Sequence, residues 1–115
     1  MNFIAIDVET ANADYSSICQ IGIAIFNNGE VIEKLKIFVN PEDYFDPFNV
    51  SIHGINPKDV ENAPTFNEFY NELKFFLEDK IVIHHMPFDR IAINRACDCY
   101  GLEWIKSKWL DSAKI

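Results

Sequence analysis

The stretch Phe3-Ile4-Ala5-Ile6-Asp7-Val8-Glu9-Thr10 decides the fold and carries the first chemical signal. The apolar run over residues 2–8 is typical of a short strand buried on both faces. Side chains alternate along a strand, so Asp7 and Glu9 are expected to point the same way. Two carboxylates this close repel each other, and a divalent cation such as Mg2+ would compensate them. A strand that simply ends in solvent-exposed acids is the alternative.

The next segments predict an antiparallel meander. Residues 18–26 are rich in Ile and Ala and form the second expected strand. The turn Asn27-Asn28-Gly29 contains Asn-Gly, a strong hairpin signal, and residues 31–39 form the returning strand. Charged residues in the middle of that third strand place it near the edge of the sheet.

The second half of the chain predicts helices and a crossover. Residues 40–64 are expected to form a long irregular segment, and the capping box Thr65-Phe66-Asn67-Glu68 starts a helix to about residue 78. A short buried strand at 81–84 and a helix over 88–100 follow, and residues 109–111 begin a fifth strand or a turn. A helix between two strands implies a parallel crossover, so we expect an α/β fold with a mixed sheet.

Size and composition predict one soluble domain. The chain has 115 residues, of which 49% are hydrophobic, enough for one core. No apolar stretch is long enough to cross a bilayer and no signal peptide opens the chain, so a cytoplasmic protein without membrane contact is expected. Cys97 and Cys99 with His84 and His85 would be an unusual zinc set, because C-x-C on a helix directs its thiols to different faces. Reduced thiols are therefore favoured.

The net charge of −8 argues against a passive nucleic-acid-binding module. Such proteins usually present a basic surface to the phosphate backbone. The charge is compatible with an enzyme that meets phosphate through bound metal ions, since those ions supply the local positive charge.

Several segments together resemble the DEDD 3′–5′ exonucleases of the DNA polymerase III epsilon-subunit type. Residues 6–10, Ile-Asp-Val-Glu-Thr, are similar to the first motif, and residues 82–89, Val-Ile-His-His-Met-Pro-Phe-Asp, to the second, usually His-Asn-Ala-x-Phe-Asp. Residues 16–22 and 52–66 resemble the segments between them. The resemblance implies a ribonuclease H-like fold that spans residues 1–115 as a single exonuclease domain.

The resemblance also implies a two-metal site of the DEDDh type. Asp7 would bridge two Mg2+ or Mn2+ ions, Glu9 would hold one of them, and Asp89 would hold the other directly or through water. Two such ions activate a water and stabilise the leaving oxygen in phosphodiester hydrolysis. The implied substrate is the 3′ end of single-stranded DNA or RNA, and the products are nucleoside 5′-monophosphates. An acid that complements the helix dipole is the alternative for Asp89.

A loop is implied to form the pocket for the terminal nucleotide. His53 and Gly54 would line it, and Ile55 would offer an apolar surface to the last base. Thr10 would face the same nucleotide beside the metals. An ordinary turn with a surface histidine, and for Thr10 a hydroxyl that satisfies nearby backbone, are the alternatives.

The second motif adds two further candidates. Phe88 would contact a base or sugar, with core packing as the alternative. His85 stands where the family has asparagine; it would donate a hydrogen bond to substrate or be a plain surface histidine.

The family's third motif, His-x-x-x-x-Asp, supplies its general base and fourth acid and is not found before Ile115. Asp111 resembles an aspartate that precedes this motif and is not assigned as a ligand. We therefore expect a domain that lacks its C-terminal portion and has impaired activity, alongside a polymerase or further domain, with a homodimer as one way to cover an exposed apolar patch. A catalytically inactive relative that binds nucleic acid or protein is the alternative function.

Overall fold

The computed structural model of the protein describes residues 1–85 and 87–112. Along these residues the elements are β1 (Phe3–Thr10), β2 (Ile18–Asn27), β3 (Glu30–Phe38), α1 (Pro47–His53), α2 (Pro57–Val60), α3 (Phe66–Leu77), β4 (Ile81–His84), α4 (Pro87–Cys99) and β5 (Lys108–Asp111).

The strands form one mixed sheet in the order β3-β2-β1-β4-β5. β1 pairs antiparallel with β2 and parallel with β4, where Ile4 lies opposite Val82. β5 extends the sheet in parallel beyond β4, so residues 109–111 belong to a strand rather than a turn. The predicted α/β class, the meander, the edge position of the third strand and the parallel crossover are confirmed.

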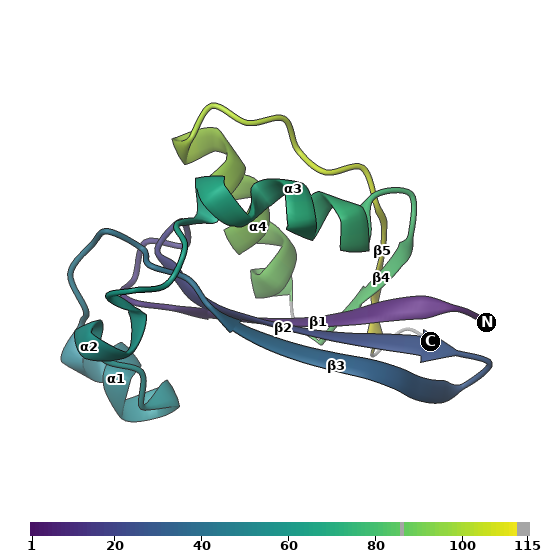
Figure 1. The fold of residues 1–115 in the computed structure, drawn as a ribbon, viewed down its shortest axis with the longest axis horizontal. Helices are drawn as coiled ribbons and strands as arrows, with labels where there is room; N and C mark the ends of the chain where they lie inside the picture. The colour runs from purple at the N-terminus through teal and green to yellow at the C-terminus, as the bar shows by residue number, and fades with distance from the viewer. Residues whose placement is uncertain (86, 113–115) are drawn as a thin grey trace.

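The two faces of the sheet differ in what covers them. Figure 1 shows α3 and α4 on one side of the sheet, with α1 and α2 at one end of it. On β1 the side chains of Ile4, Ile6 and Val8 are buried on the helix-covered side. The opposite side carries Ala5, which is half-buried, and the exposed Asp7. We call this side the open face, and the prediction that the first strand is buried on both faces is wrong.

Two local features shape the ends of β1 and β2. The β2–β3 turn has positive φ at Asn28 (53°) and Gly29 (82°), as a two-residue hairpin turn requires. At the other end, the β1–β2 register shifts between Glu9 and Thr10, so that Thr10 lies opposite Ile18. This bulge changes the course of the chain directly after the two acids, and bulges are common beside functional sites.

The segment between β3 and α3 is more ordered than the sequence predicted. Within residues 40–64, α1 begins after the cap Asp46 and α2 after the cap Asn56, each with a proline in its first turn. A capping side chain followed by proline is a helix start signal, since proline lacks only a backbone N–H that has no partner there. The prediction that residues 40–64 form one long irregular segment is therefore wrong for Pro47–His53 and Pro57–Val60.

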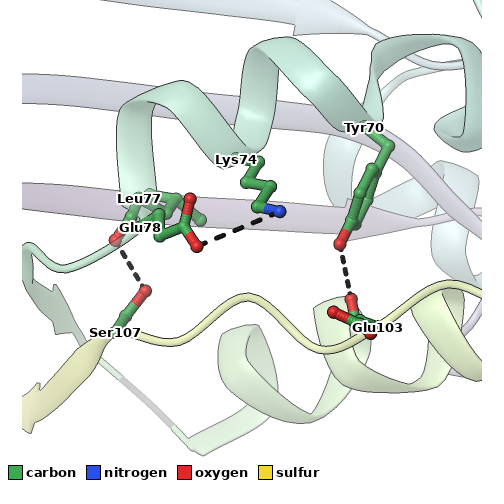
Figure 2. A network of polar contacts seen from close by, with 6 residues as sticks. All are labelled: Tyr70, Lys74, Leu77, Glu78, Glu103 and Ser107. Carbon is green, nitrogen blue, oxygen red and sulfur yellow. Dashed lines mark hydrogen bonds and ion pairs between the residues drawn. The ribbon is translucent and has the colours of Figure 1, made fainter.

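Helix α3 forms as its capping box predicted and holds the chain that leads to β5. Thr65 and Glu68 each accept a hydrogen bond from the other's backbone N–H. At the other end, the Tyr70 hydroxyl donates to the carbonyl of Glu103 at 2.7 Å and Ser107 donates to the carbonyl of Leu77 at 2.7 Å (Figure 2). These bonds tie residues 103–107 along the length of α3, and the Lys74–Glu78 ion pair lies between them in Figure 2.

Among the described residues, no helix is long and apolar enough to cross a membrane. Cys97 is buried and Cys99 is exposed, as expected for C-x-C on a helix.

Candidate active site

Asp7 and Glu9 lie near the C-terminal end of β1 on the open face. Asp7 is exposed and Glu9 is half-buried. Directly opposed residues of antiparallel strands share a face, so Gly22 of β2 lies beside Asp7. A Cβ at Gly22 would come within 3.8 Å of the Asp7 Cβ, so glycine leaves space around this carboxylate. The prediction that both acids project from one face is confirmed.

Asp89 joins the two acids from the first turn of α4. Its side chain is only 4% exposed. Its Oδ1 accepts a hydrogen bond of 3.0 Å from the backbone N–H of Val8, the residue between Asp7 and Glu9. This bond fixes the start of α4 against β1 and brings the carboxyl group of Asp89 to the two acids, 81 residues apart in sequence from Val8.

The electrostatics show that the three carboxyl groups affect one another. Burial raises the pKa of Asp89 to about 6, against the Val8 hydrogen bond that lowers it, and the charges of Asp7 and Glu9 raise it further. Burial also raises the pKa of Glu9, and the Asp7 charge adds to this effect, while His53 and Lys36 oppose it. The acids therefore form a group whose repulsion a bound cation would relieve.

The donor chemistry of this group fits a hard divalent cation, but the side chains do not converge on one point. Neither Asp7 nor Glu9 has a side-chain hydrogen bond or ion pair within residues 1–85 and 87–112. In the same part of the chain, no three His, Cys, Asp or Glu side chains are close enough together to hold a metal ion.

His53 and Thr10 make their polar contacts within the chain. His53 is half-buried, and its Nδ1 accepts a hydrogen bond from the N–H of Ile55 at 2.9 Å. The proton therefore belongs on Nε2, which donates to the carbonyl of Thr10 at 2.9 Å. The Thr10 hydroxyl is buried and donates to the carbonyl of Asn12 at 3.1 Å. Both side chains thus hold the backbone at the end of β1 in place through hydrogen bonds.

The loop after α1 places its two candidates differently. Gly54 is exposed and ends α1 in the left-handed conformation, with φ of 74°, which favours glycine. Ile55 is 5% exposed and packs with Ala11, Cys19 and Val60 in a small hydrophobic cluster. Its apolar surface is occupied by the protein itself.

Phe88 and His85 flank the start of α4 where Asp89 lies. Phe88 is half-buried against the core, and its ring meets that of Tyr15 edge-on with centroids 5.2 Å apart. His85 is exposed, lies 3.2 Å from Ser112 through its Nδ1, and its positive form lowers the pKa of Asp89.

Sequence reasoning missed three residues around this site. Tyr15, 42% exposed, brings an aromatic ring to Phe88 from a polar loop without periodicity. Asn49 donates to the Thr10 carbonyl at 3.2 Å, and Lys36 lowers the pKa of Glu9. Of these three residues, only Lys36 could have been found from the sequence. The register of the β2–β3 hairpin places it opposite Gly22, and Gly22 lies opposite Asp7.

A family model described as the RNase T exonuclease matches residues 4–101, which include Asp7, Glu9 and Asp89. The chain belongs to the RNase T family of DEDD 3′–5′ exonucleases. The resemblance found in the sequence motifs is confirmed, and divalent metal ions are typical cofactors of this family.

Two relatives are similar to this chain over nearly its whole length. It is 25% identical over 116 residues to a PolC-type DNA polymerase III of Halalkalibacterium halodurans, covering 98% of the chain and 8% of the relative. It is 26% identical over 117 residues to the 3′-5′ exonuclease DinG of Staphylococcus haemolyticus, covering 99% of the chain and 13% of the relative. The chain thus spans only a small part of each relative.

Solved structures confirm the ribonuclease H-like exonuclease fold. A structure of SSB/exonuclease I with an inhibitor gives a TM-score of 0.82 at 17% identity and covers 96% of this chain and 28% of the other. Exonuclease X in complex with 5′ overhanging duplex DNA gives 0.69 at 18% identity and covers 95% of this chain and 58% of the other. At these identities the likeness concerns the fold.

Proposed function

We propose that this exonuclease-family chain carries the metal-binding part of a 3′–5′ exonuclease that hydrolyses terminal phosphodiesters to nucleoside 5′-monophosphates. The observation that carries the proposal is the hydrogen bond from the Val8 N–H to Asp89, which brings a third carboxyl group from α4 to Asp7 and Glu9 on β1. The acids have no cation of the chain paired with them in the described part, so a bound Mg2+ or Mn2+ is the natural compensation.

Each acid has a defined task in this proposal. Asp7 and Glu9, side by side on the open face, would hold the cation from β1. Asp89 would complete the ligand set from α4, and its bond to the Val8 N–H keeps that carboxyl oriented. When bound, the divalent ions activate water and stabilise the developing charge on the phosphate.

The substrate is proposed to be the 3′ end of a single nucleic-acid strand. Phe88 with Tyr15 would contact its last base or sugar, because base–aromatic stacking tolerates any base. Gly54 and His85 lie exposed and would make further contacts. His53, Thr10 and Ile55 would act indirectly, by fixing the end of β1. The names of the relatives support DNA as the substrate and a larger polymerase or DinG-like protein as the context.

A nuclease assay tests the proposal. With 3′-labelled single-stranded DNA and Mn2+, the chain is expected to release nucleoside 5′-monophosphates, and EDTA, Asp7→Asn or Asp89→Asn is expected to abolish release. Glu72→Gln, an exposed acid on α3, is the matched control and should leave release unchanged. Release that persists in Asp7→Asn would refute the assignment.

The catalytically inactive module is the second candidate, because no three potential ligands converge in the described residues. It predicts that the chain binds single-stranded DNA in the nuclease assay mixture without cleaving it. Binding equal in the presence of Mn2+ and EDTA, with no product, would favour this function.

A further inference from the structure

A groove of about 810 Å3 lies between α4 and the edge strand β5, and none of Asp7, Glu9 and Asp89 lines it. Its lining includes His84, Arg90, Asn94, Trp104, Trp109 and Asp111. A smaller hollow of about 250 Å3 continues it, shares Arg90, Asn94 and both tryptophans, and adds Lys106. The groove is within the size range of small-molecule sites, which is about 300–1,000 Å3.

An unpartnered polar atom lies in the wall of this groove. The His84 side chain is 7% exposed, and its Nδ1 has no hydrogen-bond partner among residues 1–85 and 87–112. A buried polar atom without a partner costs roughly 1–3 kcal/mol, so such atoms are rare. This atom has almost no exposed surface, so it marks strain in the groove wall and is not itself a contact point for a ligand.

The groove has two aromatic walls, and these are the chain's only two tryptophans. Trp104 is 55% exposed, and its indole N–H donates to Asp98 at 2.8 Å, which fixes the ring. Trp109 is half-buried, with its ring 5.8 Å from the His84 ring. The segment that carries Trp104 is tied to α3 by the bonds of Figure 2, so this wall is held in place without a ligand.

The groove also offers positive charge in a chain of net charge −8. Arg90 is exposed and has no ion pair with the rest of the described chain. Its guanidinium group can donate two parallel hydrogen bonds to a phosphate, and Lys106 adds a second cation in the adjoining hollow. Two acids lie near these cations: Asp111 also lines the groove, and Asp98 accepts the hydrogen bond of the Trp104 indole.

We propose that this groove is a second, non-catalytic site that binds a nucleoside 5′-monophosphate. The base lies against the two indoles, Arg90 binds the phosphate, and the Asn94 amide hydrogen-bonds the base or sugar. A ligand with both a flat ring and a phosphate uses the aromatic walls and the cation together. The site goes beyond the proposed function; where that function holds, the ligand has the chemistry of the reaction product.

The two indole N–H signals report on this groove directly. We would record proton–nitrogen correlation spectra of the full chain in EDTA while adding thymidine 5′-monophosphate. Both indole signals are expected to shift and saturate, and Arg90→Gln is expected to weaken binding about tenfold or more, as for a lost charge-assisted hydrogen bond. Arg95→Gln, an exposed arginine of the same helix outside the groove, should bind as the wild type does.

Three outcomes would overturn the proposal. The first is no saturable shift up to about 10 mM nucleotide, which corresponds to negligible affinity. The others are equal affinity in Arg90→Gln and the wild type, and inorganic phosphate that binds as tightly as the nucleotide. EDTA removes the divalent cation on which the proposed catalytic site depends. A negative result here therefore leaves the nuclease proposal untouched, and a failed nuclease assay leaves this site untouched.

Discussion

The two faces of β1 are made by alternate residues of one strand, yet they have opposite properties. The face toward α3 and α4 carries Ile4, Ile6 and Val8, which are buried in the main core. The open face carries Asp7 and Glu9, which repel each other and have no paired cation in the described chain. The first face stabilises the fold, whereas the second carries a charge repulsion that does not stabilise it, and this second face is where the cation site is proposed.

The largest predicted effect is a difference in stability between a substitution on the buried face and one on the open face. Ile6→Ala should lower the free energy of unfolding by about 3 kcal/mol, because it removes buried methyl groups and leaves a cavity. Asp7→Asn should leave it unchanged or raise it slightly, because it removes repulsion. Urea unfolding in EDTA measures the free energy of unfolding of both variants. A loss in Asp7→Asn as large as that in Ile6→Ala would show that the two faces do not differ in their contribution to stability.

The next prediction concerns Asp89, which is buried yet belongs electrostatically to the open-face acids. Its folded pKa of about 6 lies above the usual 3.8, so the folded state holds this proton more tightly. The stability from this group is fully present below about pH 3.8 and is lost as pH rises through 6. Asp89→Asn keeps an oxygen for the Val8 N–H and should stabilise the metal-free chain at pH 7 by roughly 1–3 kcal/mol.

The same two proteins at pH 4 provide the check on this prediction. There the difference in unfolding free energy should shrink toward zero, because the wild-type carboxyl is already protonated in the folded state. A difference that stays constant between pH 7 and pH 4 would show that the charge of Asp89 is not its cause.

The smallest effect tests the open face alone. Lys36 lies in the same row as Asp7 across Gly22, and its charge lowers the pKa of Glu9. Lys36→Met should therefore raise the Glu9 pKa, as followed by carboxyl carbon chemical shifts during a pH titration. Lys58→Met, at an exposed position of α2, serves as the control, and an equal response in both variants would exclude a specific contact.

The sequence predicted the parts of this account that depend on local pattern. Strand alternation placed Asp7 and Glu9 on one face, and the Thr65–Glu68 capping box located α3. The bond between Val8 and Asp89 joins residues far apart in the chain, so their proximity required the crossover order to be inferred first. The internal hydrogen bonds of His53 had no local signal, because they depend on how α1 packs against the end of β1.

Metal-dependent stability tests the central claim most directly, that the open-face acids of β1 form a divalent cation site. Wild type and Asp7→Asn would be unfolded in urea at pH 7 with EDTA and with Mn2+. Binding to the folded state at about ten times the dissociation constant should stabilise the wild type by about 1.4 kcal/mol and leave Asp7→Asn unchanged. No stabilisation of the wild type, or equal stabilisation of both proteins, would contradict the account.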